Sequence, residues 1–301
     1  MLRPRIIPCL LVHNGGLVKT VGFDKPKYVG DPLNAVRIYN EKEVDELMVV
    51  DIDATRDRRD PDYTLIARLA AECRMPLAYG GGVHSVEQFE RLISLGVEKV
   101  AVSAAAVADL GLVGRAATRV GRQSVVVVID VRRTGSNFEV FTHNGSRATG
   151  IDAIDFARRA EAAGAGEIVV NSIDRDGQMK GYDLELVRSM REAVTLPLTV
   201  LGGAGSLGDI GALVREFGIV GAAAGSLFVF KGVYRAVLIS YPSRSDKDTL
   251  IQGAATGHRF HETSPPEPQE RLHRSCRSPR AARRPRAVAD PHRAHSGLGR
   301  H

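Results

Sequence analysis

The strongest constraint on the fold is an internal repeat with an offset of about 120 residues. The segment VVDID at 49–53 recurs as VVNSID at 169–174, YGGGVHSVEQF at 79–89 as LGGAGSLGDI at 201–210, and VAVSAAA at 100–106 as VGAAAGS at 220–226. A duplicated half-barrel explains all three matches, whereas a single doubly wound sheet does not. The repeat therefore predicts two similar halves that close into one barrel.

Strand-like and helix-like segments alternate along both halves. Eight strands are predicted: Arg5–Val12, Glu46–Asp51, Leu77–Tyr79, Lys99–Val102, Ser124–Asp130, Glu167–Asn171, Leu198–Leu201 and Val220–Ala223. Helices are predicted between them, among them Pro61–Cys73, Ser85–Leu95, Asp152–Ala163, Asp183–Ala193 and Leu207–Phe217, with N-caps at Asp60 and Ser85. This α/β alternation implies parallel βαβ units, and eight units in this length fit a (βα)8 TIM barrel.

The segment SVVVVIDV at 124–131 is the most informative of these strands. Its continuous β-branched run suits a parallel strand that is buried on both faces. Asp130 then lies at the carboxyl end of the strand, which is the end where barrels of this kind place their chemistry. We therefore take Asp130 as the candidate general acid or base. An acid that only caps a loop or pairs with Arg132 or Arg133 is the alternative.

Composition separates a neutral body from a basic tail. The chain has a net charge of +6, and residues 258–301, with ten arginines and four acids, carry all of it. The tail has no apolar period, so we expect a barrel over residues 1–250 and a disordered Arg/Pro-rich tail over residues 251–301. Residues 243–251 are expected to finish a last helix or its turn. A tail that binds nucleic acid or an anionic surface is the alternative; the composition favours disorder, and no nucleic-acid partner is expected.

Cysteine content and hydropathy restrict the compartment. Cys9, Cys73 and Cys276 show no metal-binding or CxxC spacing, which indicates reduced thiols and a cytoplasmic protein. The chain has no apolar run of about 18 residues and no convincing signal peptide, so no membrane association is expected.

Two glycine turns predict phosphate binding. Gly80-Gly81-Gly82 and Gly202-Gly203-Ala204-Gly205 each follow a strand and precede a helix, so their backbone amides can close on an anion. A packing turn would have the same sequence, but two turns at repeat-related positions favour a ligand. The turns Ser103-Ala104-Ala105 and Gly225-Ser226 complete the two sites, which implies a long bisphosphate ligand.

Polar residues in two loops add to this site. Asp176 and Gly177 follow the sixth strand and can hold substrate hydroxyls. Lys19 lies in a long glycine-rich segment, 14–23, that we interpret as a loop able to fold over a phosphate. A solvated loop lysine is the alternative. Asp51, Asp53 and Asp174 also lie at strand ends.

These motifs together resemble a known family. The segments RIIPCL, GGLVK, YGGGV, VVVIDV, GAGEIVVNSIDRDG, KGYD and GGAGS resemble the HisF family, the cyclase subunit of imidazole glycerol phosphate synthase, over roughly residues 1–242. The resemblance implies a TIM barrel that receives ammonia from a glutaminase partner, HisH. The ammonia attacks a ribulosyl aminoimidazole carboxamide bisphosphate, giving imidazole glycerol phosphate and an aminoimidazole carboxamide ribotide. It implies no cofactor and no metal.

The resemblance also assigns roles to individual residues. It makes Asp130 catalytic, Lys19 the loop lysine, and Glu98 an acid that faces the partner. The phosphate positions match Gly81, Gly82, Asp176, Gly177, Gly203, Ala204, Gly225 and Ser226. The charged ring that gates the ammonia tunnel matches Arg5, Glu46, Lys99 and Glu167.

Two positions depart from the family pattern. The family's other catalytic aspartate, in IPCLDV, is here Leu11, and an Asn-Thr pair of the first phosphate site is here Ser103-Ala104. The segments KYVGDPLNAVRIYNEKEVDEL and FVFKGVYRAVLISYPSR resemble HisF paralogues found with surface-polysaccharide genes, which are thought to supply ammonia for amidino-sugar formation. We therefore favour such a paralogue. A histidine-pathway cyclase and a non-catalytic scaffold that activates the glutaminase are the alternatives.

Overall fold

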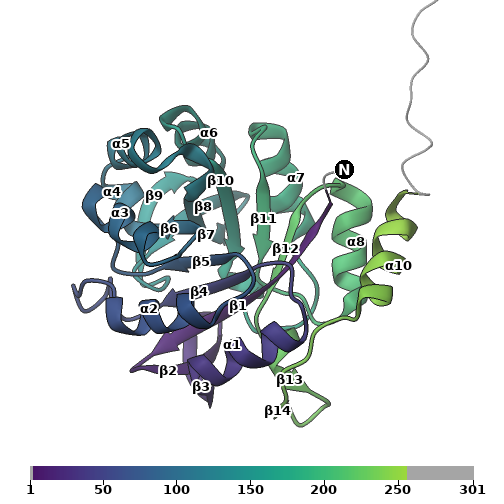
Figure 1. Ribbon diagram of the computed structural model, residues 1–301. Coiled ribbons are helices and arrows are strands. Elements are labelled where there is room, and N and C mark those ends of the chain that lie inside the picture. Colours follow the sequence, from purple (N-terminus) through teal and green to yellow (C-terminus); the bar gives the residue numbers. More distant parts are fainter. Residues whose placement is uncertain (1–2, 256–301) are drawn as a thin grey trace, which may run out of the picture. The chain divides into compact units, whose positions relative to one another are not determined.

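The computed structural model describes residues 3–255, in which eight parallel strands form a closed barrel (Figure 1). The barrel strands are β1 (Arg5–His13), β4 (Leu47–Asp51), β5 (Leu77–Gly80), β6 (Lys99–Val102), β7 (Val125–Thr134), β10 (Glu167–Ser172), β11 (Leu198–Leu201) and β12 (Gly221–Ala224). Pairing of β1 with β12 and of β7 with β10 joins the halves and closes the ring. The predicted TIM barrel is confirmed, and each predicted strand overlaps an observed one.

Helices surround the barrel because each has one apolar face to bury. They are α1 (Pro32–Glu41), α2 (Tyr63–Glu72), α3 (Val86–Ser94), α4 (Ala104–Ala108), α5 (Gly111–Val120), α6 (Ala153–Ala163), α7 (Leu184–Ala193), α8 (Leu207–Phe217), α9 (Ser226–Val229) and α10 (Arg244–Ala255), with short 3₁₀ turns η1 (Arg122–Ser124) and η2 (Ile173–Arg175). Within residues 3–255, no helix combines the length and apolar character needed to cross a membrane.

Helix capping agrees with the sequence at one position and differs at another. Ser85 begins α3 with a capping box, in which its side chain accepts from the backbone of Gln88 while the Gln88 side chain accepts in return. The predicted cap at Asp60 is wrong. The cap of α2 is Asp62, whose carboxylate accepts from the Leu65 amide, so the helix starts two residues after Pro61.

Two antiparallel hairpins interrupt the βα alternation. The first, β2 (Gly16–Val21) and β3 (Asp24–Gly30), follows β1, and the second, β8 (Asn137–Thr142) and β9 (Arg147–Asp152), follows β7. Segment 14–23 is therefore mostly a strand and its turns, and the prediction of a loop there is wrong. Both hairpins follow the first strand of their half, so the repeat extends to them.

The hydrophobic core has two parts. The larger lies between the strands and the helices, and the smaller fills the barrel interior. The interior residues are Ile7, Cys9, Met48, Ala78, Ala101, Val126, Val169 and Ala223. The interior is therefore apolar between its two ends.

The chain ends the barrel with a short hairpin and a helix. β13 (Phe230–Lys231) pairs with β14 (Ala236–Val237), and α10 then packs against α8. The expected last helix is thus present and continues to Ala255. The rest of the predicted tail, with Cys276, lies outside the described residues.

Candidate functional site

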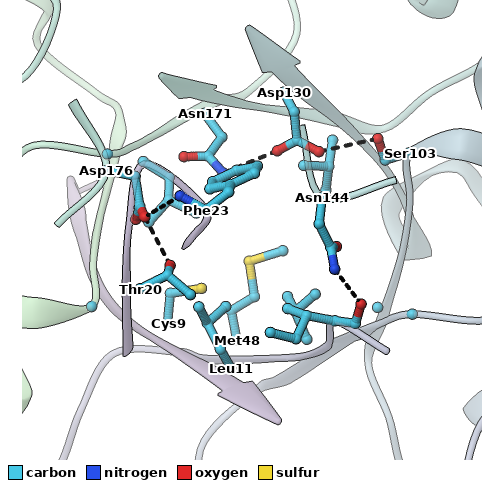
Figure 2. A pocket seen from close by; sticks show the side chains of 18 of the residues that line it. Cys9, Leu11, Thr20, Phe23, Met48, Ser103, Asp130, Asn144, Asn171 and Asp176 are labelled. Carbon is cyan, nitrogen blue, oxygen red and sulfur yellow. Dashed lines mark hydrogen bonds between the residues drawn. The ribbon is translucent and has the colours of Figure 1, made fainter. Parts of the chain in front are cut away.

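A single pocket at the carboxyl ends of the strands gathers the predicted substrate site (Figure 2). Its empty volume is about 1320 Å³, its solvent-filled mouth included. The predicted residues among those lining it are Leu11, Lys19, Gly81, Gly82, Ser103, Ala104, Asp130, Asp176, Gly177, Gly203, Ala204, Gly225 and Ser226. Residues from both halves of the repeat therefore face one cavity.

Asp130 lies on β7 where the strand begins to pair with β8, between two neutral hydrogen-bond donors. Asn171 Nδ2 donates to Asp130 Oδ1 at 3.0 Å, and Ser103 Oγ donates to Oδ2 at 3.4 Å. Burial raises the pKa of Asp130 to about 6, although both hydrogen bonds favour the charged form. The group can thus take up or release a proton near neutral pH, as a general acid or base must.

Leu11 occupies the wall of the pocket opposite Asp130 (Figure 2). It lies on β1, the strand that corresponds to β7 in the repeat, and each residue is paired with the antiparallel hairpin that follows its strand. The pocket therefore has a carboxylate on one repeat-related strand and an alkyl side chain on the other.

Lys19 lies on β2, and its side chain is buried against the wall of the pocket. It is 5% exposed, and its ammonium donates to the Cys9 carbonyl. A Cβ on Gly225 would collide with Lys19 Nζ, so the glycine makes room for the ammonium at this turn. Burial lowers the pKa of Lys19.

Asp176 holds the first hairpin in place. Its Oδ2 accepts from Thr20 Oγ1 at 2.8 Å and from the Phe23 amide at 3.2 Å, and its carbonyl accepts from the Gly22 amide. Burial raises the pKa of Asp176, which these bonds partly oppose. Asp176 therefore has a structural role, and its contact with substrate stays a prediction.

The glycine turns have a geometric reason for their composition. Gly81 and Gly203 have φ of +113° and +112°, and a Cβ on either would collide with a backbone carbonyl, of Asp51 and Gly181 respectively. Each turn thus needs glycine both for its backbone angle and for close packing.

Several acids at strand ends have structural partners instead. Asp51 accepts from the amides of Asp53 and Ala54, and Asp53 binds His13 Nδ1 at 2.8 Å. Asp174 accepts from the Arg133 amide at 2.9 Å. Asp53 and Asp174 are absent from the pocket lining.

Asn171 is the residue at the site that sequence analysis missed. In the sequence it stands only within the repeated segment VVNSID, where its counterpart in the first half is Asp51. The signal that would identify it is the register of β10 on β7, in which Asn171 is opposite Asp130. Its Oδ1 is buried without a hydrogen-bond partner in residues 3–255.

A ring of four charges closes the opposite end of the barrel. Arg5 pairs with Glu46 and, at 2.7 Å, with Glu167; Lys99 Nζ lies 2.9 Å from both glutamates. Burial opposes ionisation of Glu167, but Arg5 and Lys99 outweigh it and lower its pKa. The predicted ring residues thus meet at the amino-terminal ends of β1, β4, β6 and β10, whereas Glu98 is exposed beside them in sequence.

The family model for histidine biosynthesis proteins matches residues 5–235. A putative imidazole glycerol phosphate synthase subunit HisF of Leptospira interrogans is 57% identical over 253 residues, 83% of this chain and 100% of that protein. The chain belongs to the HisF family.

Two further HisF relatives extend the comparison. A putative subunit hisF3 of Vibrio vulnificus is 56% identical over 84% of this chain and 98% of its own length. The imidazole glycerol phosphate synthase subunit HisF of Hyphomonas neptunium is 47% identical over 76% of this chain and 91% of its own. Membership of the HisF family is consistent with the closed barrel, which has the pocket at one end and the charged ring at the other.

Proposed function

We propose that this HisF-family chain is the barrel subunit of a cytoplasmic glutamine amidotransferase complex. In this proposal, a HisH-like glutaminase docks beside Glu98 at the charged end and releases ammonia, which moves through the barrel to the pocket. Three features support it: the ring of two cations and two anions, the apolar interior behind that ring, and the pocket at the far end. An apolar interior suits uncharged ammonia because it offers a poor environment for ammonium.

The pocket would hold a phosphorylated ligand. Support comes from Lys19, whose buried ammonium lies at the Gly225 turn, and from the positive-φ turn at Gly203. Asp130, with a pKa of about 6, would move a proton on that ligand.

Leu11 is the residue that distinguishes the cyclase reaction from ammonia delivery by a paralogue. A cyclase that needs a carboxylate on each wall of the pocket would lack one here, because Leu11 faces Asp130 (Figure 2). Loss of a general acid or base costs about 10²–10⁴-fold in rate. We therefore propose a paralogue that delivers ammonia for amidino-sugar synthesis in a surface-polysaccharide pathway.

Two alternatives are testable beside it. One is a lyase of histidine biosynthesis in which Asp130 alone supports the cyclase reaction. The other is a scaffold that activates the glutaminase and performs no chemistry, which would be favoured if Asp130→Asn left downstream amidination intact.

The deciding experiment is an assay with the histidine-pathway bisphosphate and an ammonium salt. We expect negligible turnover by the wild-type protein and a gain of about 10²-fold or more in Leu11→Asp, which restores a second carboxylate opposite Asp130. The matched control is Val128→Asp, which adds a carboxylate to the same pocket on the strand of Asp130 and is expected to give no gain. Ordinary wild-type turnover would contradict the paralogue proposal.

A further inference from the structure

The two glycine-turn cups differ in charge despite the repeat. We define the first cup by Gly82, Ser103 and Ala104, and the second cup by Gly203, Gly225 and Ser226; both line the pocket. The second cup includes the Lys19 ammonium, which lies against Gly225. The cups should therefore differ in what they bind.

The buried Lys19 ammonium has more hydrogen-bond donors than acceptors around it. Its ammonium carries three N–H donors, and the Cys9 carbonyl is the one acceptor it has in residues 3–255. Asp176 acts on Lys19 electrostatically, but the described residues provide no ion pair to Lys19. Because a buried charge is stable when it is paired, the remaining donors suit a dianionic group in the second cup.

The second hairpin has a hydroxyl at the position where the first hairpin has this cation. Leu11 is opposite Val18 in the first hairpin, and Asp130 is opposite Phe141 in the second, so the counterpart of Lys19 is Thr142. Thr142 is 3% exposed, and its hydroxyl lies 3.0 Å from His143 Nδ1. The second hairpin therefore brings no lysine to the first cup.

The side-chain donors of the first cup are few, and two of its polar groups already have partners. The Gly82 amide donates to Thr55 Oγ1 at 3.3 Å, and Ser103 Oγ donates to Asp130. Ala104 has no polar side-chain atom, and Asp51 adds a carboxylate to this part of the lining. A second dianion would thus meet uncharged backbone amides at the start of α4 and no ammonium, near the Asp51 carboxylate that Arg59 approaches to 3.7 Å.

We propose that the pocket accepts a ligand with a single phosphate, held in the second cup, and that the first cup receives an uncharged, hydroxyl-bearing end of the same ligand. This inference rests on the proposed function for the assignment of the pocket to a phosphorylated ligand. It narrows the substrate class from a bisphosphate to a monophosphate ester of a polyol or sugar.

The test compares two probes that differ by one phosphate. Isothermal titration of the purified full chain with mannitol 1-phosphate and with mannitol 1,6-bisphosphate measures what the second phosphate adds. We expect one site per chain for both, with dissociation constants within about threefold of each other. A bisphosphate bound about 100-fold more tightly, or two inorganic phosphates bound per chain, would overturn the inference.

Variants locate the phosphate in one cup. Lys19→Met should weaken the monophosphate about tenfold or more, because it removes charge-assisted donors. Lys27→Met, an exposed lysine of the same hairpin, is the control and should bind as wild type. Equal binding by Lys19→Met and wild type would refute the placement.

A second variant, designed to bind the bisphosphate more tightly, tests the inference even if Lys19→Met does not fold. Ser103→Asn with Ala104→Thr adds donors to the first cup, so it should tighten the bisphosphate about tenfold and leave the monophosphate unchanged. No change in either probe would count against the inference. Ammonia transfer from the glutaminase is measured separately, so its failure identifies the proposed function as wrong, whereas a bisphosphate preference overturns only the one-phosphate inference.

Discussion

Asp130 accepts from Asn171 and Ser103, two neutral donors, and no cation is paired with it within residues 3–255. Its position was predictable from sequence, because it follows the buried apolar run of a parallel strand and so reaches the edge of the barrel that carries chemistry. Asn171 was not predictable, because its role depends on the register between β7 and β10, which are about 40 residues apart in sequence. The environment of Asp130 therefore comes from the fold, whereas its location comes from its own strand.

Asp130→Asn should stabilise the protein at neutral pH. Burial raises the folded pKa to about 6 from the ordinary 3.8, so the folded state binds the proton more tightly than the unfolded state. Stability then falls as pH rises from about 4 to about 6 and is constant above that. Urea unfolding at pH 7.5 should show a gain of about 1–2 kcal/mol, reduced from the full shift because the group is partly exposed.

The same measurement at pH 4 supplies the control. The gain should largely vanish there, since Asp130 is protonated in the folded state. Asp174→Asn, an exposed acid near the same mouth, controls for the loss of a charge. A gain of equal size at both pH values would show that Asp130 does not titrate in this range.

At the scale of elements, the barrel strands were predictable and the hairpins were not. β-branched runs and the repeat fix the strands, because their burial on both faces selects for such residues. Segment 14–23 carries three glycines and an asparagine, typical of a loop, but Asn14, Gly15 and Gly22 supply the positive φ of the hairpin turns. Lys19 was therefore placed in a loop, whereas it is fixed on a strand.

Gly81→Ala should destabilise far more than a glycine substitution at an open turn. Gly81 has φ of +113°, and a Cβ there would collide with the Asp51 carbonyl. We expect a loss of about 3 kcal/mol or more in the free energy of unfolding. Gly150→Ala is the control, with φ of +70° and open space around it, and should cost about 1 kcal/mol. Equal losses would mean that the turn relaxes to admit a side chain.

At the scale of the whole molecule, the charged ring joins strands from both halves. Arg5 and Glu46 come from the first half with Lys99, and Glu167 comes from the second. The resemblance to HisF named these four residues, but only the closed barrel brings them into contact. Their mutual pairing is what allows charges to be buried there.

Glu167→Gln should therefore cost more than the loss of a surface ion pair. It leaves Arg5 and Lys99 with one carboxylate between them in a poorly solvated place, for which we expect about 2–4 kcal/mol. Glu90→Gln breaks the exposed pair with Arg119 and should cost less than about 1 kcal/mol. Urea unfolding of both variants checks this, and similar losses would contradict a stabilising ring.

The hairpins connect the halves crosswise. The first hairpin is held by Asp176, which follows β10 of the second half, and the second hairpin is held by Asn144, whose Nδ2 donates to the Ile52 carbonyl after β4 of the first half. The hairpin of each half is thus held by a hydrogen bond to the other half. A half expressed alone would lack the partner of its hairpin. Two copies of one half could supply the eight strands of a barrel, but both hairpin contacts would then have to form between identical chains.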